Sequence, residues 1–267
     1  MSCRAVVNQK GGVGKTTTAL TMAGLMQDAG RRQLLIDLDP HGSLTTYLGQ
    51  DPDAVEAGAY RLFERVAAGE KMLGAPELAL CHEGTGLAFI PGSPALATID
   101  RRFGGVAGMG RVIARAVAEL RPRYDDIWID CSPTLGVIMV NALAACDAVL
   151  IPVQTEFLAL KGLQRMLETL RLIEKSRGHP ISRLIIPTMF DRRTRASIEA
   201  LRTLRDNYEN QLWAYPVPVD TRFRTASARG LLVSQLDPDS RGLRAYARVA
   251  EALLAAEKAS EEEQVGT

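Results

Sequence analysis

A glycine-rich stretch that carries two lysines lies close to the start of the chain. Its residues are Asn8, Gln9, Lys10, Gly11, Gly12, Val13, Gly14, Lys15, Thr16 and Thr17. Glycines let backbone N–H groups turn toward a phosphate, and the N-terminus of a following helix adds positive charge at the same point. We expect Lys15 to contact the β- and γ-phosphates of a nucleotide and Thr16 to ligate Mg²⁺. Gln9 stands where the usual pattern, GxxxxGK followed by Ser or Thr, has its first glycine.

Three aspartates follow apolar runs that have the composition of buried strands. Asp37 and Asp39 end one run, and Asp130 ends another. Two carboxylates at i and i+2 leave a strand on the same side, so both can face one site. We expect Asp130 to hold Mg²⁺ through a water molecule.

Together these stretches resemble the ParA/MinD family of ATPases, whose phosphate-binding loop is a deviant Walker A motif. The resemblance implies that Lys10 reaches across a dimer to the ATP of the partner, as an arginine finger would. It also implies that Asp39 positions the attacking water and that Asp37 supports the metal or Lys15. His41 occupies the place of a glutamine in most members, and we assign it no role.

Four further stretches resemble the Soj-like ParA branch of this family, at residues 149–157, 160–163, 188–194 and 236–242. The resemblance implies that the loops after the last two strands close on adenine, and we expect contacts from Thr188, Met189, Pro216, Val217, Pro218 and Asp220. Residues 39–49 resemble the ParC subfamily, ParA-like proteins that place chemotaxis arrays at cell poles.

The hydrophobic pattern predicts an α/β fold with a single doubly wound, mostly parallel sheet and helices on both faces. We expect strands at residues 4–8, 33–38, 86–90, 126–130, 148–152, 183–189 and 213–217. We expect helices at residues 15–29, 106–120, 136–144, 160–176, 197–207 and 243–258. Because the last expected helix ends at residue 258, we predict one P-loop ATPase domain over residues 1–258 and an acidic flexible tail over residues 259–267.

Basic residues are concentrated in one part of the chain. The net charge is +1, but residues 161–250 hold 17 of the 32 lysines and arginines and only 9 of the 31 acidic residues. Arginine suits non-specific contacts to phosphate backbones. Arg193 and Arg222 match positions that ParA-like proteins use for sequence-independent DNA binding, so the resemblance implies that they contact DNA, and we expect the same of Arg224. Because 26 of the 32 basic residues are arginine, general arginine usage remains an alternative explanation.

The predicted function is that of a ParA-like ATPase, which binds ATP and Mg²⁺ as an ATP-sandwich homodimer and hydrolyses ATP slowly. Expected partners are non-specific DNA and a ParB-like or chemotaxis-adaptor-like activator, with a chemotaxis array, plasmid or chromosome as cargo. The sequence has no apolar run of the length that spans a bilayer. We therefore expect a cytoplasmic, nucleoid-associated or polar protein without membrane insertion. The alternatives are a MinD-like membrane-site or cell-division regulator and an ATP-dependent biosynthetic ligase of similar fold.

Overall fold

A central sheet organises the computed structural model, which describes residues 2–265. Its strands are β1 (Ser2–Val6), β2 (Gln33–Leu38), β3 (Leu80–Cys81), β4 (Ala88–Ile90), β5 (Asp126–Cys131), β6 (Ala148–Gln154) and β7 (Ser182–Thr188). They lie in the order β3-β4-β2-β5-β1-β6-β7, and only β3 runs antiparallel to its neighbour. The predicted fold class is confirmed.

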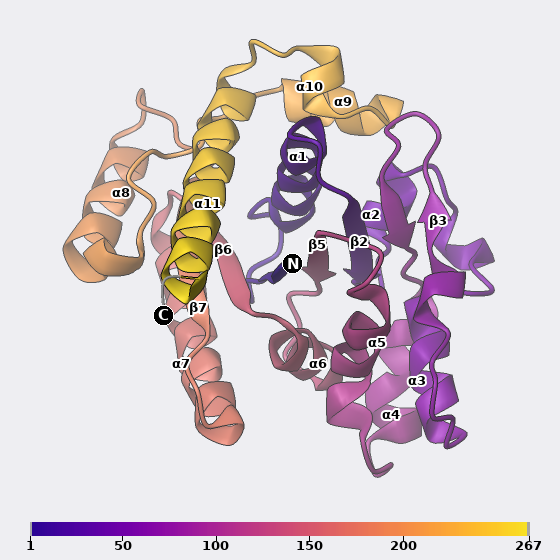
Figure 1. Cartoon of the computed structure of the whole chain (residues 1–267). Helices are drawn as coiled ribbons and strands as arrows, with labels where there is room; N and C mark the ends of the chain where they lie inside the picture. Colours follow the sequence, from indigo (N-terminus) through magenta and orange to yellow (C-terminus); the bar gives the residue numbers. More distant parts are fainter. Residues whose placement is uncertain (1, 266–267) are drawn as a thin grey trace.

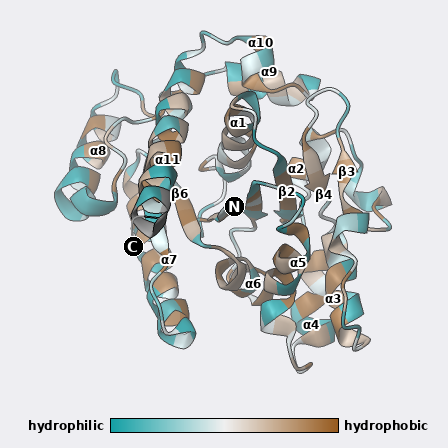
Figure 2. Ribbon diagram, viewed as in Figure 1, coloured by the Kyte–Doolittle hydropathy of each residue, from teal (hydrophilic) through white to brown (hydrophobic). Residues whose placement is uncertain are grey.

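Helices cover both faces of the sheet (Figure 1). They are α1 (Lys15–Asp28), α2 (Ser43–Tyr47), α3 (Ala59–Ala67), α4 (Ile99–Phe103), α5 (Val112–Leu120), α6 (Val137–Ala145), α7 (Phe157–Arg177), α8 (Arg195–Tyr208), α9 (Arg222–Arg229), α10 (Val233–Leu236) and α11 (Arg241–Val265). Figure 2 shows hydrophobic residues on the central strands and hydrophilic residues along the outer sides of α8 and α11.

Alternation along the strands divides the core into two layers. In β5, Ile127 and Ile129 pack with α3, α5, α6 and α7, whereas Trp128 packs with α1 and α11. Successive strand side chains point to opposite faces, and both faces here are apolar, as in a sheet covered by helices on each side. The buried strands thereby bring their carboxyl ends to one edge, which carries the site described below.

A buried ionic network joins the opposite edge of the sheet to α11. Asp126 accepts hydrogen bonds from Arg4 (2.9 Å), from Arg31 (2.7 and 2.8 Å) and from Gln33 (2.8 Å). Glu257 of α11 completes it by pairing with both arginines. Arg4 is 3% exposed and Asp126 is fully buried. The attraction between the opposite charges therefore offsets the free-energy cost of removing each charge from water.

Several elements differ from the sequence prediction. The helix expected at residues 106–120 begins only at Val112, as α5, and the strand expected at residues 86–90 begins at Ala88, as β4. Residues 213–217 do not form a strand, although Trp213 and Val217 donate backbone hydrogen bonds to β7. The isolated bridges lie on either side of this stretch, between Leu212 and Ile185 and between Pro218 and Phe190. The short β3 was not predicted. Helix α11 continues to Val265, beyond the predicted end at residue 258. The division into a domain over residues 1–258 and a tail over residues 259–267 stays a prediction, and residues 266–267 of that tail lie outside the described part of the chain.

Candidate nucleotide site

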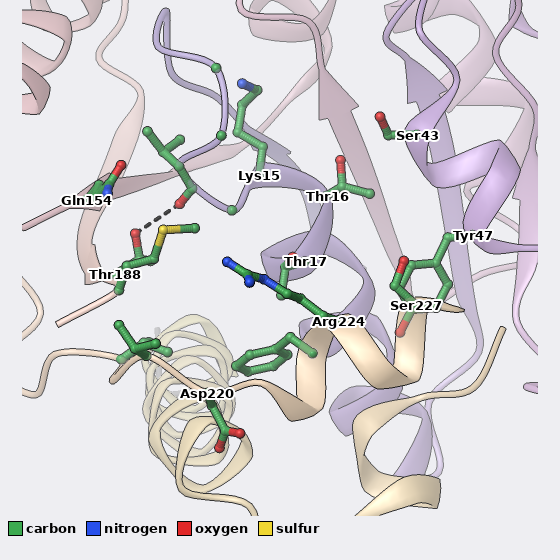
Figure 3. Close-up of a pocket in the computed structure, with 18 of the residues that line it drawn as sticks. Lys15, Thr16, Thr17, Ser43, Tyr47, Gln154, Thr188, Asp220, Arg224 and Ser227 are labelled. Carbon is green, nitrogen blue, oxygen red and sulfur yellow. Dashed lines mark hydrogen bonds between the residues drawn. The ribbon is translucent and has the colours of Figure 1, made fainter. Parts of the chain in front are cut away.

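The glycine-rich loop connects β1 to α1 and lines a large cavity. Gly12 and Gly14 have φ angles of 74° and 93°, a backbone conformation that residues other than glycine rarely adopt. The cavity has a volume of about 990 Å³ and is lined by every residue from Gly11 to Thr17 (Figure 3). A volume of this size suits a small-molecule ligand.

Neighbouring side chains fix the start of the loop. Asn8 accepts a hydrogen bond from the backbone N–H of Lys10 (3.0 Å) and donates one to the carbonyl of Pro152 (2.9 Å). Gln9 donates to the Thr169 hydroxyl of α7 at 2.8 Å. The glutamine that breaks the usual glycine pattern therefore ties the loop to α7.

Lys15 and Lys10 point in different directions. Lys15 is 7% exposed and lines the cavity, and its ammonium donates to the Lys10 carbonyl at 3.2 Å. Burial lowers the pKa of Lys15, against the charges of Asp130 and Asp39. Lys10 is absent from the cavity lining, and its side chain forms an ion pair with Glu156 beside Gln154.

Thr16 and Asp130 meet at the floor of the loop. The Thr16 hydroxyl donates to Oδ2 of Asp130 at 2.6 Å. Oδ1 of Asp130 is buried and has no hydrogen-bond partner among the described residues. Burial, followed by the charge of Asp37, raises the pKa of Asp130 to about 8. A hydroxyl beside a carboxylate with one uncommitted oxygen is a set of hard oxygen donors that fits Mg²⁺.

Asp37 braces the turn after β2. Register pairing places it directly opposite Asp130 on the neighbouring strand. Its Oδ1 accepts from the N–H of Asp39 (3.0 Å), and its Oδ2 accepts from the N–H (2.9 Å) and hydroxyl (2.6 Å) of Thr45. Burial raises the pKa of Asp37 to about 6 in spite of these bonds. Both carboxylate oxygens of Asp37 therefore accept hydrogen bonds from residues of the turn. The expectation that Asp37 supports the metal or Lys15 stays a prediction.

Asp39 lies at the cavity wall with His41. Both residues line the cavity. Oδ1 of Asp39 accepts from the backbone N–H of His41 at 3.0 Å and lies 3.0 Å from Nδ1 of its ring. The carboxylate therefore faces the nucleotide side of the loop, where the sequence predicts that it positions water.

The side of the cavity next to β7 contains most of the residues predicted for adenine. Thr188, Met189, Val217, Pro218 and Asp220 line it, whereas Pro216 does not. Thr188 donates to the Val13 carbonyl at 2.9 Å, which fixes β7 against the loop. Met189 has a φ angle of 53°, and strained residues of this kind gather at ligand sites.

Asp220 contacts the polypeptide instead of presenting a free carboxylate. Its oxygens accept from the N–H of Arg222 (3.0 Å), the hydroxyl of Ser240 (2.9 Å) and the N–H of Gly242 (3.0 Å). Burial alone would raise the pKa of Asp220, but these hydrogen bonds hold it below its ordinary value. Asp220 thus joins the start of α9 to the start of α11.

The predicted DNA-contacting arginines do not form one group. Arg193 pairs with Asp191 (2.7 Å) and Arg222 pairs with Asp237 (3.0 Å), and both arginines are largely exposed. Arg224 instead lines the nucleotide cavity. A DNA contact by Arg224 stays a prediction, against which its position in the cavity argues.

Sequence reasoning missed the contribution of two short helices to this site. Tyr47 at the end of α2 and Phe223, Ser227 and Ala228 of α9 also line the cavity. Tyr47 lies in the stretch over residues 39–49 that was singled out for another reason, and no motif marks the three α9 residues. The helices α2 and α9 reach the loop only through the tertiary fold.

Comparisons with known proteins agree with this geometry. Residues 1–182 match the AAA_31 family, described as an AAA domain. The chain is 34% identical to the chromosome-partitioning ATPase Soj of Thermus thermophilus, covering 94% of each chain. It is also 34% identical to the chromosome partitioning protein ParA of Caulobacter vibrioides, covering 95% of this chain and 94% of that protein.

A solved structure has the same fold over nearly the whole chain. It is cobyrinic acid a,c-diamide synthase from Mycobacterium smegmatis with bound ADP and magnesium, with a TM-score of 0.83 and 32% identity. The alignment covers 97% of this chain and 96% of that one. With its phosphate-binding loop, its two lysines and its Soj and ParA relatives, the chain belongs to the ParA/MinD family of ATPases.

Proposed function

We propose that this ATPase binds Mg·ATP, forms a homodimer across two bound nucleotides, and hydrolyses ATP slowly to position a cargo. The observation that carries the proposal is the divergence of the two loop lysines. Lys15 faces the cavity of its own chain, while Lys10 lies outside that cavity at the molecular surface. Lys15 can serve the nucleotide of its own subunit, and Lys10 is placed to serve the nucleotide of a second copy.

The contact that holds Lys10 in the single chain is exchangeable. The Lys10 and Glu156 side chains are 27% and 38% exposed, and exposed ion pairs typically stabilise a fold by less than about 1 kcal/mol. A phosphate oxygen of a partner's nucleotide, in a site closed to water, attracts an ammonium group more strongly. Dimerisation can therefore transfer Lys10 from Glu156 to ATP at little cost.

Exposed apolar side chains lie near the same face. Leu135 is 55% exposed and follows the cavity residue Pro133, and Phe157 and Leu158 are 70% and 65% exposed beside Glu156. A two-fold dimer buries one surface patch against its own copy. Burial of these three side chains in such an interface accounts for their apolar character.

DNA is the proposed scaffold for the dimer. The loop after β7 carries Arg193, and the segment before α9 leads to Arg222. Backbone hydrogen bonds between Phe190 and residues 217 and 219 hold these two segments together. The two arginines thereby lie on neighbouring segments, Arg193 in the loop after β7 and Arg222 at the start of α9, and guanidinium groups suit sequence-independent contact with phosphates.

The proposed cargo is based on the resemblance of residues 39–49 to the ParC subfamily. We favour a chemotaxis array, with a chemotaxis-adaptor-like activator, over a plasmid or chromosome with a ParB-like activator. The protein would then be nucleoid-associated or polar. A gene neighbourhood with chemotaxis genes supports the first cargo, and a neighbouring ParB gene supports the second.

A MinD-like membrane role receives less support. Among residues 2–265, no helix combines the length and the apolar character needed to cross a bilayer. The apolar face of α11 is also occupied, because Tyr246, Val249 and Ala250 are buried against the sheet and α1. Those side chains are therefore not available to insert between lipid headgroups.

A biosynthetic ligase remains the second candidate, since the Mycobacterium smegmatis structure is named a cobyrinic acid a,c-diamide synthase and is 32% identical to this chain. A ligase requires an acid substrate for turnover and gains nothing from DNA. ATP hydrolysis that depends on such a substrate, in a protein that stays monomeric with ATP, would favour this candidate.

Sedimentation velocity tests the proposal. The wild type and Asp39→Ala are compared in Mg·ATP and in Mg·ADP, with and without non-specific duplex DNA at low and moderate salt. We expect a dimer and a DNA complex only with ATP, and most strongly for Asp39→Ala, which should hydrolyse it too slowly to reset. A monomer under every condition would reject the positioning role.

A further inference from the structure

Arg224 is directed into the nucleotide cavity from the side opposite the glycine-rich loop. It lines the cavity together with Phe223, Ser227 and Ala228 of α9. Figure 3 shows its side chain running past Thr17, with the guanidinium between Thr17 and Thr188. An α-helix turns by about 100° per residue, so Arg224 and Arg222 lie on opposite sides of α9.

Arg222 and Arg224 also differ in whether an acidic side chain pairs with them. Arg222 pairs with Asp237 outside the cavity. Within residues 2–265, no ion pair or side-chain hydrogen bond engages Arg224, and the carboxylate of nearby Asp220 already accepts from Ser240 and Gly242. A guanidinium that faces a cavity in this state is a donor suited to a phosphate.

The position of Arg224 along the cavity indicates which phosphate it reaches. Lys15 and Thr16 mark the end where the terminal phosphates and Mg²⁺ bind, and Thr188 and Pro218 line the cavity on the side of β7. Thr17 is the next residue of α1 after Thr16, beyond the metal end of the loop, and the Arg224 guanidinium lies beside it, on the side toward Thr188. The phosphate nearest the ribose, present in both ATP and ADP, is expected between them.

We propose that Arg224 binds the ribose-proximal phosphate of the nucleotide, in ATP and ADP alike, and so fastens α9 over the occupied site. The inference rests on the proposed nucleotide site and adds a contact from α9 to it. Because Arg222 lies on the other side of the same helix, a bound nucleotide would also fix the orientation of Arg222 at the surface. The contact holds the nucleotide without distinguishing the ATP state from the ADP state.

The test compares nucleotide affinity in matched variants. Dissociation constants for Mg·ATP and Mg·ADP are measured by calorimetry for the wild type, Arg224→Ala, Arg224→Lys and the control Arg229→Ala, an exposed arginine of α9 outside the cavity lining. Loss of a charge-assisted hydrogen bond in a solvent-accessible site weakens binding about tenfold. We expect Arg224→Ala to lose about this factor for both nucleotides, Arg224→Lys to recover part of it, and Arg229→Ala to bind as the wild type does.

Hydrogen exchange supplies an independent readout. ADP should slow amide exchange in α9 of the wild type, and this protection should be lost in Arg224→Ala at saturating ADP. Unchanged ADP affinity in Arg224→Ala would overturn the proposal, as would a loss confined to ATP. A loss of DNA binding with normal nucleotide affinity would also overturn it and would return Arg224 to the DNA surface.

Lys15→Ala separates this failure from failure of the nucleotide site itself. If the cavity binds the nucleotide, Lys15→Ala abolishes binding whatever Arg224 does. Retained binding in Lys15→Ala would reject the site, whereas a normal Arg224→Ala beside a defective Lys15→Ala would reject only the contact from α9.

Discussion

The Thr16 hydroxyl donates a 2.6 Å hydrogen bond to Asp130, although the two residues are 114 positions apart in the chain. Thr16 lies in the first turn of α1 and Asp130 lies near the end of β5, so the bond joins the phosphate-binding loop to the centre of the sheet. The other Asp130 oxygen remains without a partner within the described residues. This pair is the expected Mg²⁺ site.

Replacement of Asp130 by asparagine should uncouple ATP binding from Mg²⁺. Asparagine keeps the shape of the side chain but removes the charge that attracts the cation. Addition of Mg²⁺ should raise the ATP affinity of the wild type, and we expect this increase to be about tenfold or more smaller in Asp130→Asn. Titration with ATP in the presence and absence of Mg²⁺ measures the two affinities, with the surface variant Asp147→Asn as control. An unchanged response to Mg²⁺ would remove Asp130 from the metal site.

The phosphate loop and its carboxylates could be predicted because local sequence determines them. Gly12 and Gly14 are required by their positive φ angles, and apolar runs that end in aspartate deliver Asp37 and Asp130 to the same edge of the sheet. Parallel strands that are buried on both faces are continuous apolar runs, so their existence was also predictable.

Features that depend on tertiary placement could not be predicted in the same way. Residues 213–217 have the composition of a strand, but Pro216 and Pro218 lack the N–H groups that a ladder needs. Only Trp213 and Val217 donate to β7. The position of Arg224 depends on the packing of α9, and a cluster of arginines in the sequence cannot show that one of them faces the cavity.

Reversal of charge at Arg222 should weaken DNA binding without affecting the dimer. We expect Arg222→Glu, introduced into Asp39→Ala, to lose at least about tenfold in affinity for non-specific duplex DNA at low salt, because a phosphate contact becomes a repulsion. Fluorescence anisotropy measures the affinity, and sedimentation in Mg·ATP checks the dimer. The matched control is Arg61→Glu on α3, where the arginine is similarly exposed and also ion-paired. Equal DNA affinity in both variants would leave Arg222 as a solvated surface residue.

The buried network around Asp126 should contribute strongly to stability. Asp126→Asn leaves Arg4 with one fewer negative partner in a site that is almost fully buried. Breaking such a pair costs about 3 kcal/mol in the free energy of unfolding at pH 7, as measured by urea denaturation. Asp125→Asn is the control, since Asp125 pairs with the exposed Arg32 at the surface. Equal effects of the two substitutions would mean that burial adds nothing to the network.

The same network gives the stability a defined dependence on pH. Burial alone would raise the pKa of Asp126, but hydrogen bonds from Arg31 and Gln33 and the charge of Arg4 hold it below its ordinary value of 3.8. A carboxyl with a lowered pKa in the folded state stabilises the protein above its unfolded pKa and loses that contribution as pH falls through the folded pKa. The stability difference between wild type and Asp126→Asn should therefore be full at pH 7 and shrink below about pH 4. A difference that grows on acidification would contradict this assignment.

Mixing two inactive variants tests most directly whether Lys10 acts on the nucleotide of a second copy. Lys10→Ala lacks the lysine and Asp39→Ala lacks the carboxylate, so each homodimer should be inactive. In a mixed dimer, the site of the Lys10→Ala subunit keeps its own Asp39 and receives Lys10 from the other subunit, which makes one complete site. Random pairing of equal amounts, combined before ATP is added, should restore about a quarter of the wild-type ATPase rate. A mixture as inactive as its two components would contradict action across the dimer and assign Lys10 to its own subunit.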